Sequence, residues 1–138
     1  MKKIMSYFLL ATMLISCNDA LDIQVIYPFD LQVMPVIRRI KFGETAEIRC
    51  QIVREGYYAG TQFFIRYFQT DGDGELRLDD GRVLTPNDLF RLEKDAFRLY
   101  YTSYSKEQQV IDIYVEDTHK QIVQRTFVFQ HEIERKEE

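Results

Sequence analysis

The sequence predicts an all-β fold, an antiparallel sandwich of about seven strands. From residue 28 onward, apolar and polar residues alternate with a period of two, which is typical of strands that bury one face. Gly, Asp and Asn residues interrupt this alternation at spacings of roughly ten residues, as turns between short strands do. Ten Phe and nine Tyr residues supply apolar volume for a core. Strands spaced in this way are typical of immunoglobulin-like and fibronectin-like sandwiches, and we expect that arrangement here.

The expected strands follow one another in order along the chain. They cover residues 29–36 and 45–53, then 61–69, two short strands within 75–83, and finally 96–103, 108–117 and 121–130. In the second strand, Ile48 and Ile52 fall on one face and are expected to enter the core. In the last strand, Val123, Phe127 and Phe129 are expected to do the same.

Residues 85–95 interrupt the strand pattern. The segment opens with residues that favour a turn, and we expect a single helical turn to follow. Leu89 and Leu92 would then lie against the core.

The N-terminus has the organisation of a bacterial lipoprotein precursor. Lys2 and Lys3 precede a short apolar run, which ends in "LISC" with the small residue Ser16 directly before Cys17. The run is shorter than the ~20 apolar residues that span a bilayer, so it is typical of a secretory signal. Cleavage before Cys17 would leave its thiol for lipid attachment. Acyl chains such as palmitate contribute about 0.8 kcal/mol per buried methylene and anchor a protein without a spanning helix.

This interpretation divides the chain into four parts. We expect a lipoprotein signal peptide at 1–17, a tether at 18–27, the sandwich domain at 28–130 and a charged tail at 131–138. Only Cys50 remains after position 17, so no disulfide can form within the mature domain. Cys50 lies on the inward face of its strand, which predicts a buried, unreactive thiol.

Composition and motifs argue against several functions. The formal net charge is −4 and no basic stripe occurs, which argues against direct binding to nucleic acid. His119 and His131 are the two histidines of the chain, and neither belongs to a zinc-protease motif. The nucleophile elbow, the P-loop and the dinucleotide fingerprint are also missing from the sequence. We therefore expect no enzymatic activity, no cofactor and no small-molecule substrate.

The stretch "FQTDGDGELRLDDGR" (68–82) is the strongest candidate for a metal site. If Gly74 takes position 6 of a calcium-binding loop, Asp71, Asp73 and Asp80 fall at positions 3, 5 and 12. Position 1 lacks a carboxylate, position 12 lacks the usual Glu, and both flanks have strand patterns rather than helical ones. We therefore expect a hairpin turn whose aspartates accept hydrogen bonds from its own amides, with a weak calcium site as the alternative.

Segments spread across the mature chain resemble one family. They are, in order, "CNDALDIQ", "YPF", "MPV", "GETAEIRC", "GYYAGTQFFIRYFQTDGDGELRLDDG", "PNDLFRLEKDAFRLYYTS", "QQVIDIYVED" and "TFVF". Together they resemble the TraQ family of conjugative transposons, small lipoproteins with an immunoglobulin-like sandwich. The resemblance implies a role in conjugal DNA transfer, as an accessory part of the envelope-spanning secretion apparatus. It brings no catalytic residues. It implies membrane contact through the lipid, other conjugal transfer proteins as partners, and a cell-envelope location that we expect to be the outer membrane.

A protein of this kind would act by binding other proteins, and "GYYAG" (56–60) is the first candidate contact. Tyr57 and Tyr58 between two glycines at a loop tip would offer amphipathic surface at a small entropic cost. The other interpretation is that both tyrosines cover the end of the sandwich. Two other functions stay open: a surface lipoprotein that binds a glycan or host ligand through Tyr-rich loops, and a calcium-dependent module.

The lipid anchor can be tested directly. Replacing Cys17 by Ser removes the thiol that would carry the diacylglyceryl group, so metabolic labelling with palmitate should be lost. The precursor should stay uncut or the protein should be released from membranes. Palmitate labelling that persists in Cys17→Ser would show that the acyl chains sit elsewhere.

Overall fold

The computed structural model describes residues 27–56 and 60–133 of the 138-residue chain. Within these ranges the chain forms nine strands and no helix. The strands are β1 (Phe29–Val33), β2 (Arg39–Ile40), β3 (Thr45–Arg54), β4 (Phe63–Asp71), β5 (Gly74–Leu78), β6 (Phe90–Leu92), β7 (Ala96–Ser103), β8 (Gln109–Asp117) and β9 (Ile122–His131). No helix long and apolar enough to cross a membrane occurs in this part of the chain.

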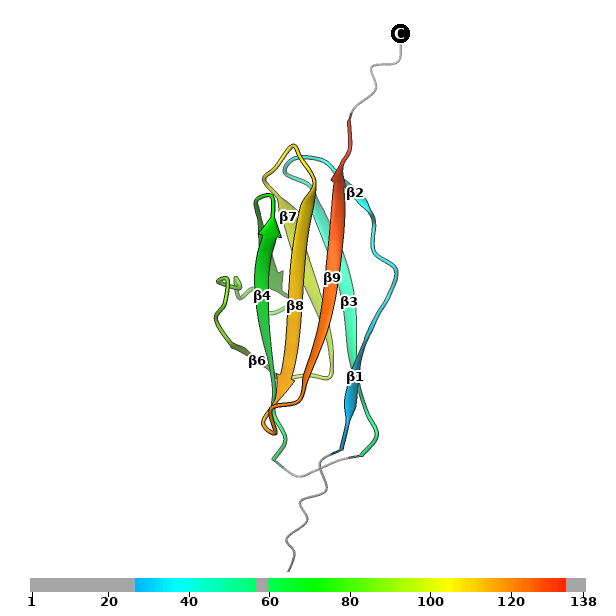
Figure 1. Cartoon of the computed structure of the whole chain (residues 1–138), viewed down its shortest axis with the longest axis vertical. Helices are drawn as coiled ribbons and strands as arrows, with labels where there is room; N and C mark the ends of the chain where they lie inside the picture. Colours follow the sequence, from blue (N-terminus) through cyan, green and yellow to red (C-terminus); the bar gives the residue numbers. More distant parts are fainter. Residues whose placement is uncertain (1–26, 57–59, 134–138) are drawn as a thin grey trace, which may run out of the picture.

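The strands build two sheets that pack face to face (Figure 1). Sheet 1 has the order β1-β3-β7-β5, and sheet 2 has the order β2-β9-β8-β4-β6. Neighbouring strands are antiparallel, except that β2 runs parallel to β9. In space, β1-β3-β7-β5 and β9-β8-β4 follow the ABED and GFC order of immunoglobulin domains. The predicted sandwich is therefore confirmed, and the short strands β2 and β6 are additions that the prediction missed.

The alternation of apolar residues places one face of each long strand in the core. Ile48 and Ile52 of β3 are buried as predicted, with Cys50 between them. On β8, Ile113 and Val115 are buried in the same way. Burying one such aliphatic side chain contributes roughly 1.5–3 kcal/mol. A register slip by one residue would expose the whole set, so the core fixes the register of each strand.

The turn after β4 differs from the predicted hairpin. Strand β4 pairs with β8 and β6 in sheet 2, whereas β5 pairs with β7 in sheet 1. The turn therefore carries the chain from one sheet to the other, and the prediction of a hairpin is wrong. A bulge between Gln69 and Asp71 precedes the turn, and Gly72 adopts a φ of 73°. Gly72 suits this position because side-chain-bearing residues rarely adopt that conformation.

Residues 75–95 depart from expectation in two further ways. Of the two short strands expected around the Asp79–Gly81 turn, only β5 forms, and Val83 makes an isolated bridge to Arg77. No helical turn follows, because the chain extends into β6 and pairs with β4. Leu92 is buried as expected, but Leu89 is 45% exposed.

The last strand has the predicted inward face, but that face is incompletely covered. Phe129 is 1% exposed, whereas Val123 and Phe127 are only partly buried against the core. The outer neighbour of β9 is β2, which pairs only with Gln130 and His131. In the described part of the chain, the outer edge of β9 before Gln130 therefore has no strand beside it.

Tyr101 links the two sheets inside the core. It lies on β7 in sheet 1, and its ring stacks on Phe129 of sheet 2 with 5.0 Å between the ring centroids. Its hydroxyl donates a hydrogen bond to Gln109 Oε1 (2.7 Å) and accepts one from Gln69 Nε2 (3.0 Å), and both glutamines belong to sheet 2. Gln69 Oε1 in turn accepts a hydrogen bond from the Tyr67 hydroxyl at 2.9 Å. Side-chain amides therefore satisfy both buried phenols, across the interface between the sheets for Tyr101 and within β4 for Tyr67.

Burial keeps these phenols in their donor form. It raises the pKa of Tyr67 to about 12 and also raises the pKa of Tyr101, so both hydroxyls carry a proton at neutral pH. Gly74, at the start of β5, leaves room for this cluster, since a Cβ there would collide with the Tyr101 hydroxyl.

Removing the Tyr101 hydroxyl should therefore destabilise the domain. Tyr101→Phe keeps the stack on Phe129 but leaves the buried Oε1 of Gln109 without its donor, which typically costs about 1–3 kcal/mol, and removes one of the two hydrogen bonds that Gln69 Nε2 donates. Urea unfolding monitored by circular dichroism measures the loss. Tyr104→Phe is the matched control, because Tyr104 is 46% exposed and should change stability by less than about 0.5 kcal/mol. Equal stability of the two variants would contradict a role for the buried hydroxyl.

Candidate functional site

Three residues predicted from the sequence lie outside the described ranges. They are Cys17, Tyr57 and Tyr58. Lipidation at Cys17 and docking through the two tyrosines therefore stay predictions.

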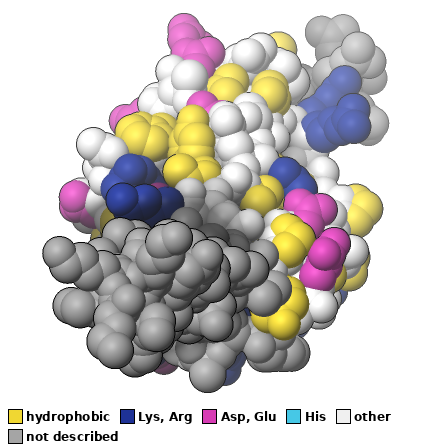
Figure 2. Space-filling view, turned by 60° about the horizontal axis from the view of Figure 1, so that its bottom comes forward, with side chains coloured by type: hydrophobic (Ala, Val, Ile, Leu, Met, Phe, Trp, Pro, Cys, Tyr) yellow, Lys and Arg dark blue, Asp and Glu magenta, His cyan; other side chains and the backbone are white. Residues whose placement is uncertain are grey.

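The described neighbours of the tyrosine pair lie at one end of the sandwich. Strand β3 ends there and β4 begins there, next to the start of β1 (Figure 1). A Cβ on Gly56 would overlap the ring of Tyr27, so the glycine backbone lies directly against that ring. Gly60 has a φ of 91°, which again favours glycine. Figure 2 brings this end forward and shows hydrophobic side chains interspersed with charged ones on the surface that is not drawn in grey.

The aspartates of the proposed calcium loop do not converge. Asp71 Oδ1 accepts a hydrogen bond from the Gly72 N–H at 3.0 Å, as expected for a turn. Asp73 precedes β5 and Asp80 follows it, so a five-residue strand of about 16 Å separates them. Among the described residues, no group of three or more His, Cys, Asp and Glu side chains is placed to hold a metal ion.

Asp80 belongs to a separate turn. Its carboxylate accepts hydrogen bonds from the Arg82 backbone N–H (3.0 Å) and from Arg82 Nε (2.8 Å). The backbone hydrogen bond is the main cause that holds the pKa of Asp80 below its usual value, so the carboxylate is ionised and already engaged.

The remaining reactive side chains are dispersed. Cys50 is a buried free thiol, and burial raises its pKa to about 12, which leaves it protonated and a poor nucleophile. His119 lies in the turn between β8 and β9, whereas His131 ends β9 at the opposite end of that ten-residue strand. These three side chains therefore do not form a catalytic cluster.

The outward faces of both sheets carry charged groups, and that of sheet 2 also has an aromatic pair. On sheet 1, Glu47 forms ion pairs with Arg49 (3.1 Å) and Arg98 (3.3 Å), which gives a solvated charged surface.

On sheet 2, Phe68 and Tyr114 make an edge-to-face contact with 5.6 Å between centroids. The Asp112 carboxylate, opposite Phe68, accepts hydrogen bonds from the Thr70 and Thr126 hydroxyls. Aromatic side chains on an exposed sheet face are more typical of contact surfaces than charge networks are.

A groove lies beside sheet 2. It lies between the outer edge of β9 and the segment that leads from β1 in sheet 1 to β2 in sheet 2, and it has a volume of about 560 Å³. We call it the β9 groove. Its lining residues are Val33, Met34, Pro35, Val36, Ile37, Arg38, Thr126, Phe127, Val128, Phe129 and Gln130.

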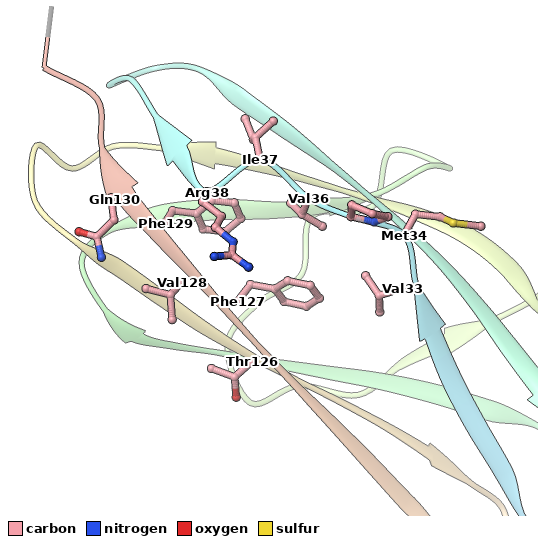
Figure 3. A pocket seen from close by; sticks show the side chains of 11 residues that line it. Val33, Met34, Val36, Ile37, Arg38, Thr126, Phe127, Val128, Phe129 and Gln130 are labelled. Atoms are coloured by element: carbon pink, nitrogen blue, oxygen red, sulfur yellow. The ribbon is translucent and has the colours of Figure 1, made fainter.

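The side chains that line the β9 groove are mostly apolar, and one of them is cationic. In Figure 3 the Phe127 ring points from β9 toward Val33, and the guanidinium group of Arg38 lies among the other lining side chains. Met34 is 58% exposed and Ile37 is 50% exposed, so apolar surface is available to a partner. The sequence signal for this feature is Pro35, which ends the pairing of β1 with β3 and starts the crossing to sheet 2.

Three solved structures of Bacteroides proteins resemble this chain over most of its length. A conjugative transposon lipoprotein from Bacteroides eggerthii is 42% identical with a TM-score of 0.71, over 75% of this chain and 98% of that one. A lipoprotein from Bacteroides thetaiotaomicron is 52% identical with a TM-score of 0.72, over 84% and 89% of the two chains. A conjugate transposon protein from Bacteroides vulgatus is 47% identical with a TM-score of 0.69, over 86% and 97%. No curated protein gives a significant match.

Fold and relatives together define a small β-sandwich protein of the kind encoded by Bacteroides mobile elements. The family model for the TraQ conjugal transfer protein matches residues 1–132. The chain belongs to this family, and the resemblance seen in its sequence segments is confirmed. Membership implies a role in conjugal transfer, and the family is not a known enzyme family.

Calcium should have little effect on the turn between β4 and β5. Because Asp71 already bonds its own turn and Asp80 is paired with Arg82, calcium at millimolar concentration should leave the amide resonances of Gly72 and Gly74 in place. The measurement is a calcium titration followed by heteronuclear NMR. A saturable shift with a micromolar midpoint would show instead that the aspartates form a calcium site.

Proposed function

We propose that this protein acts in conjugal DNA transfer as a lipid-anchored accessory component of the envelope-spanning secretion apparatus, where it binds other transfer proteins. The observation that carries the proposal is the match of residues 1–132 to the TraQ conjugal transfer family. Two related structures, at 42% and 52% identity, are of proteins described as lipoproteins. The first of these proteins, and a third at 47% identity, are described as products of conjugative transposons.

The anchor would hold the domain by one end of the sandwich. The lipobox ends at Cys17, and Tyr27, the first described residue, accepts a hydrogen bond through its backbone O from Gln121 Nε2 at 3.0 Å. Gln121 directly precedes β9, so the chain enters at the end where β9 begins. Strand β9 ends at the opposite end of the sandwich (Figure 1). We propose the outer membrane as the anchored membrane.

A binding role fits the chemistry of the described residues better than catalysis does. The reactive side chains are buried or far apart, as the protonated Cys50 thiol illustrates. The exposed apolar residues of the β9 groove and the aromatic pair predicted at Tyr57 and Tyr58 are instead of the types enriched in protein interfaces. Both surfaces are candidates for contact with other transfer proteins.

The role in transfer is tested by deleting the gene from a donor strain that carries the mobile element. We expect the mating frequency to fall and to be restored by the wild-type gene supplied in trans. If the deletion strain transfers at the wild-type frequency, the proposed function is wrong. A surface protein that binds a glycan or host ligand would give that outcome.

The contribution of Tyr57 and Tyr58 is tested in the same complementation assay. Interface aromatics of the hot-spot type supply about 2 kcal/mol or more each, so replacing both by Ala should weaken docking roughly a thousandfold. We expect Tyr57→Ala with Tyr58→Ala to remain folded and lipidated but to restore transfer poorly. Tyr100→Ala with Tyr104→Ala is a matched double control away from the 56–60 loop. Full transfer by the folded Tyr57–Tyr58 variant would remove the loop from the interface.

A further inference from the structure

The main-chain groups of β9 point alternately toward β8 and away from it. The Gln121 backbone O accepts a hydrogen bond from the Asp117 N–H, so odd-numbered residues of this segment point toward β8. The Gln130 N–H donates in the opposite direction, to the Arg38 backbone O at 2.7 Å. Even-numbered residues of β9 therefore direct their N–H and C=O groups to the outer edge.

Part of that outer edge is open. Nearer the start of β9, the Arg125 side chain connects this edge to β1. Its Nη1 donates to the Gln124 backbone O (2.8 Å), and its Nη2 donates to the Leu31 backbone O (2.9 Å) on β1. Further along β9, the outward N–H and C=O groups of Thr126 and Val128 have no main-chain or side-chain partner among the described residues. Unpaired strand edges are templates for pairing with another chain.

The open edge lies directly beside the apolar surface of the β9 groove. Thr126 and Val128 are themselves lining residues, and the Phe127 side chain between them faces into the groove (Figure 3). The stretch from Thr126 to Gln130 is about 16 Å long, which matches an extended segment of about five residues. Unpaired main-chain groups and the apolar side chains of the β9 groove therefore lie side by side along this part of β9.

Charge favours an acidic occupant. Arg38 is the one charged side chain that lines the groove. Its neighbour Arg39 is also exposed, and neither arginine has an ion pair among the described residues. The formal net charge of the whole chain is −4, so this cationic site contrasts with the charge of the molecule. A carboxylate near the β2 end of the groove would be complementary.

We propose that an extended segment of another conjugal transfer protein adds as a strand to the open edge of β9. Its main chain pairs with Thr126 and Val128, alternate apolar side chains enter the β9 groove, and an acidic side chain lies beside Arg38. Strand addition of this kind takes affinity from main-chain hydrogen bonds and specificity from the alternate side chains. The proposal rests on the proposed function, because it names how that role selects a partner.

The main-chain part of the proposal is tested with Val128→Pro. Proline removes the outward N–H of Val128, which bonds to nothing in the described part of the domain, and proline is tolerated on edge strands with the N–H side facing solvent. We expect the variant to keep its circular-dichroism spectrum but to restore mating of the deletion strain at least tenfold less well than the wild-type gene. Val128→Thr is the matched control, since it keeps the N–H and the β-branched shape, and it should restore transfer fully. Full transfer by folded Val128→Pro overturns the proposal.

A charge variant keeps the proposal testable if the proline variant does not fold. Arg38→Glu changes an exposed side chain and leaves the Arg38 backbone O free to accept from Gln130. We expect Arg38→Glu to lower transfer at least tenfold and Arg38→Lys to leave it nearly unchanged. Equal transfer by Arg38→Glu and Arg38→Lys would overturn the proposal that the partner places an acidic side chain beside Arg38. If gene deletion itself leaves transfer intact, the proposed function fails as well; if only these variants transfer normally, the strand-addition proposal fails alone.

The identity of the occupant is tested with a photoreactive amino acid at Met34, an exposed groove residue, in donor cells that carry the mobile element. An adduct to another transfer protein of the element, identified by mass spectrometry and lost in Val128→Pro, supports the proposal. An adduct between two copies of this chain would assign the groove to self-association. An internal adduct to residues 18–26 would assign it to the chain's own N-terminal segment. Each of these two results would overturn the proposal. An adduct to a protein that the element does not encode, or the absence of any adduct, would also overturn it.

Discussion

The sandwich depends on one buried contact across its two sheets. Immunoglobulin domains commonly join their sheets by a disulfide. Here the stack of Tyr101 on Phe129 and the hydrogen bonds from its hydroxyl to Gln69 and Gln109 connect the same two layers. A polar group placed this deep is stabilising only when all its partners are present. The absence of a side chain at Gly74 makes room for that arrangement, since a Cβ there would collide with the Tyr101 hydroxyl.

Most of the fold could be predicted from the local alternation of apolar and polar residues. The errors occur where the pairing of one strand with another had to be predicted. The inward faces of β3 and β8 were predictable because burial imposes a period of two. The pairing after β4 was not, because an Asp and Gly turn is compatible with a hairpin and with a crossing between sheets. Leu89 was assigned to the core on a helical spacing that the chain does not adopt, whereas Leu92 is buried on a strand.

The candidate site was harder to predict than the core. Acidic residues close in sequence, Asp73 and Asp80, lie at the two ends of one strand, so their spacing in the chain misrepresents their separation in space. The β9 groove forms between residues about ninety positions apart, Val36 and Phe127 among them, and no short motif encodes it. Only Pro35 marked the place where β1 leaves its sheet.

The strand direction of β9 has a consequence for reach. The chain enters at the end where β9 begins, and the groove starts four residues along that strand, roughly 13 Å further on. If Cys17 carries the lipid, the nine residues 18–26 add at most about 30 Å of contour length. The near end of a segment bound in the groove would then lie within about 43 Å of the bilayer surface, and its far end about 16 Å further away. The tether and the sandwich together would thus limit how far from the membrane a partner can be bound.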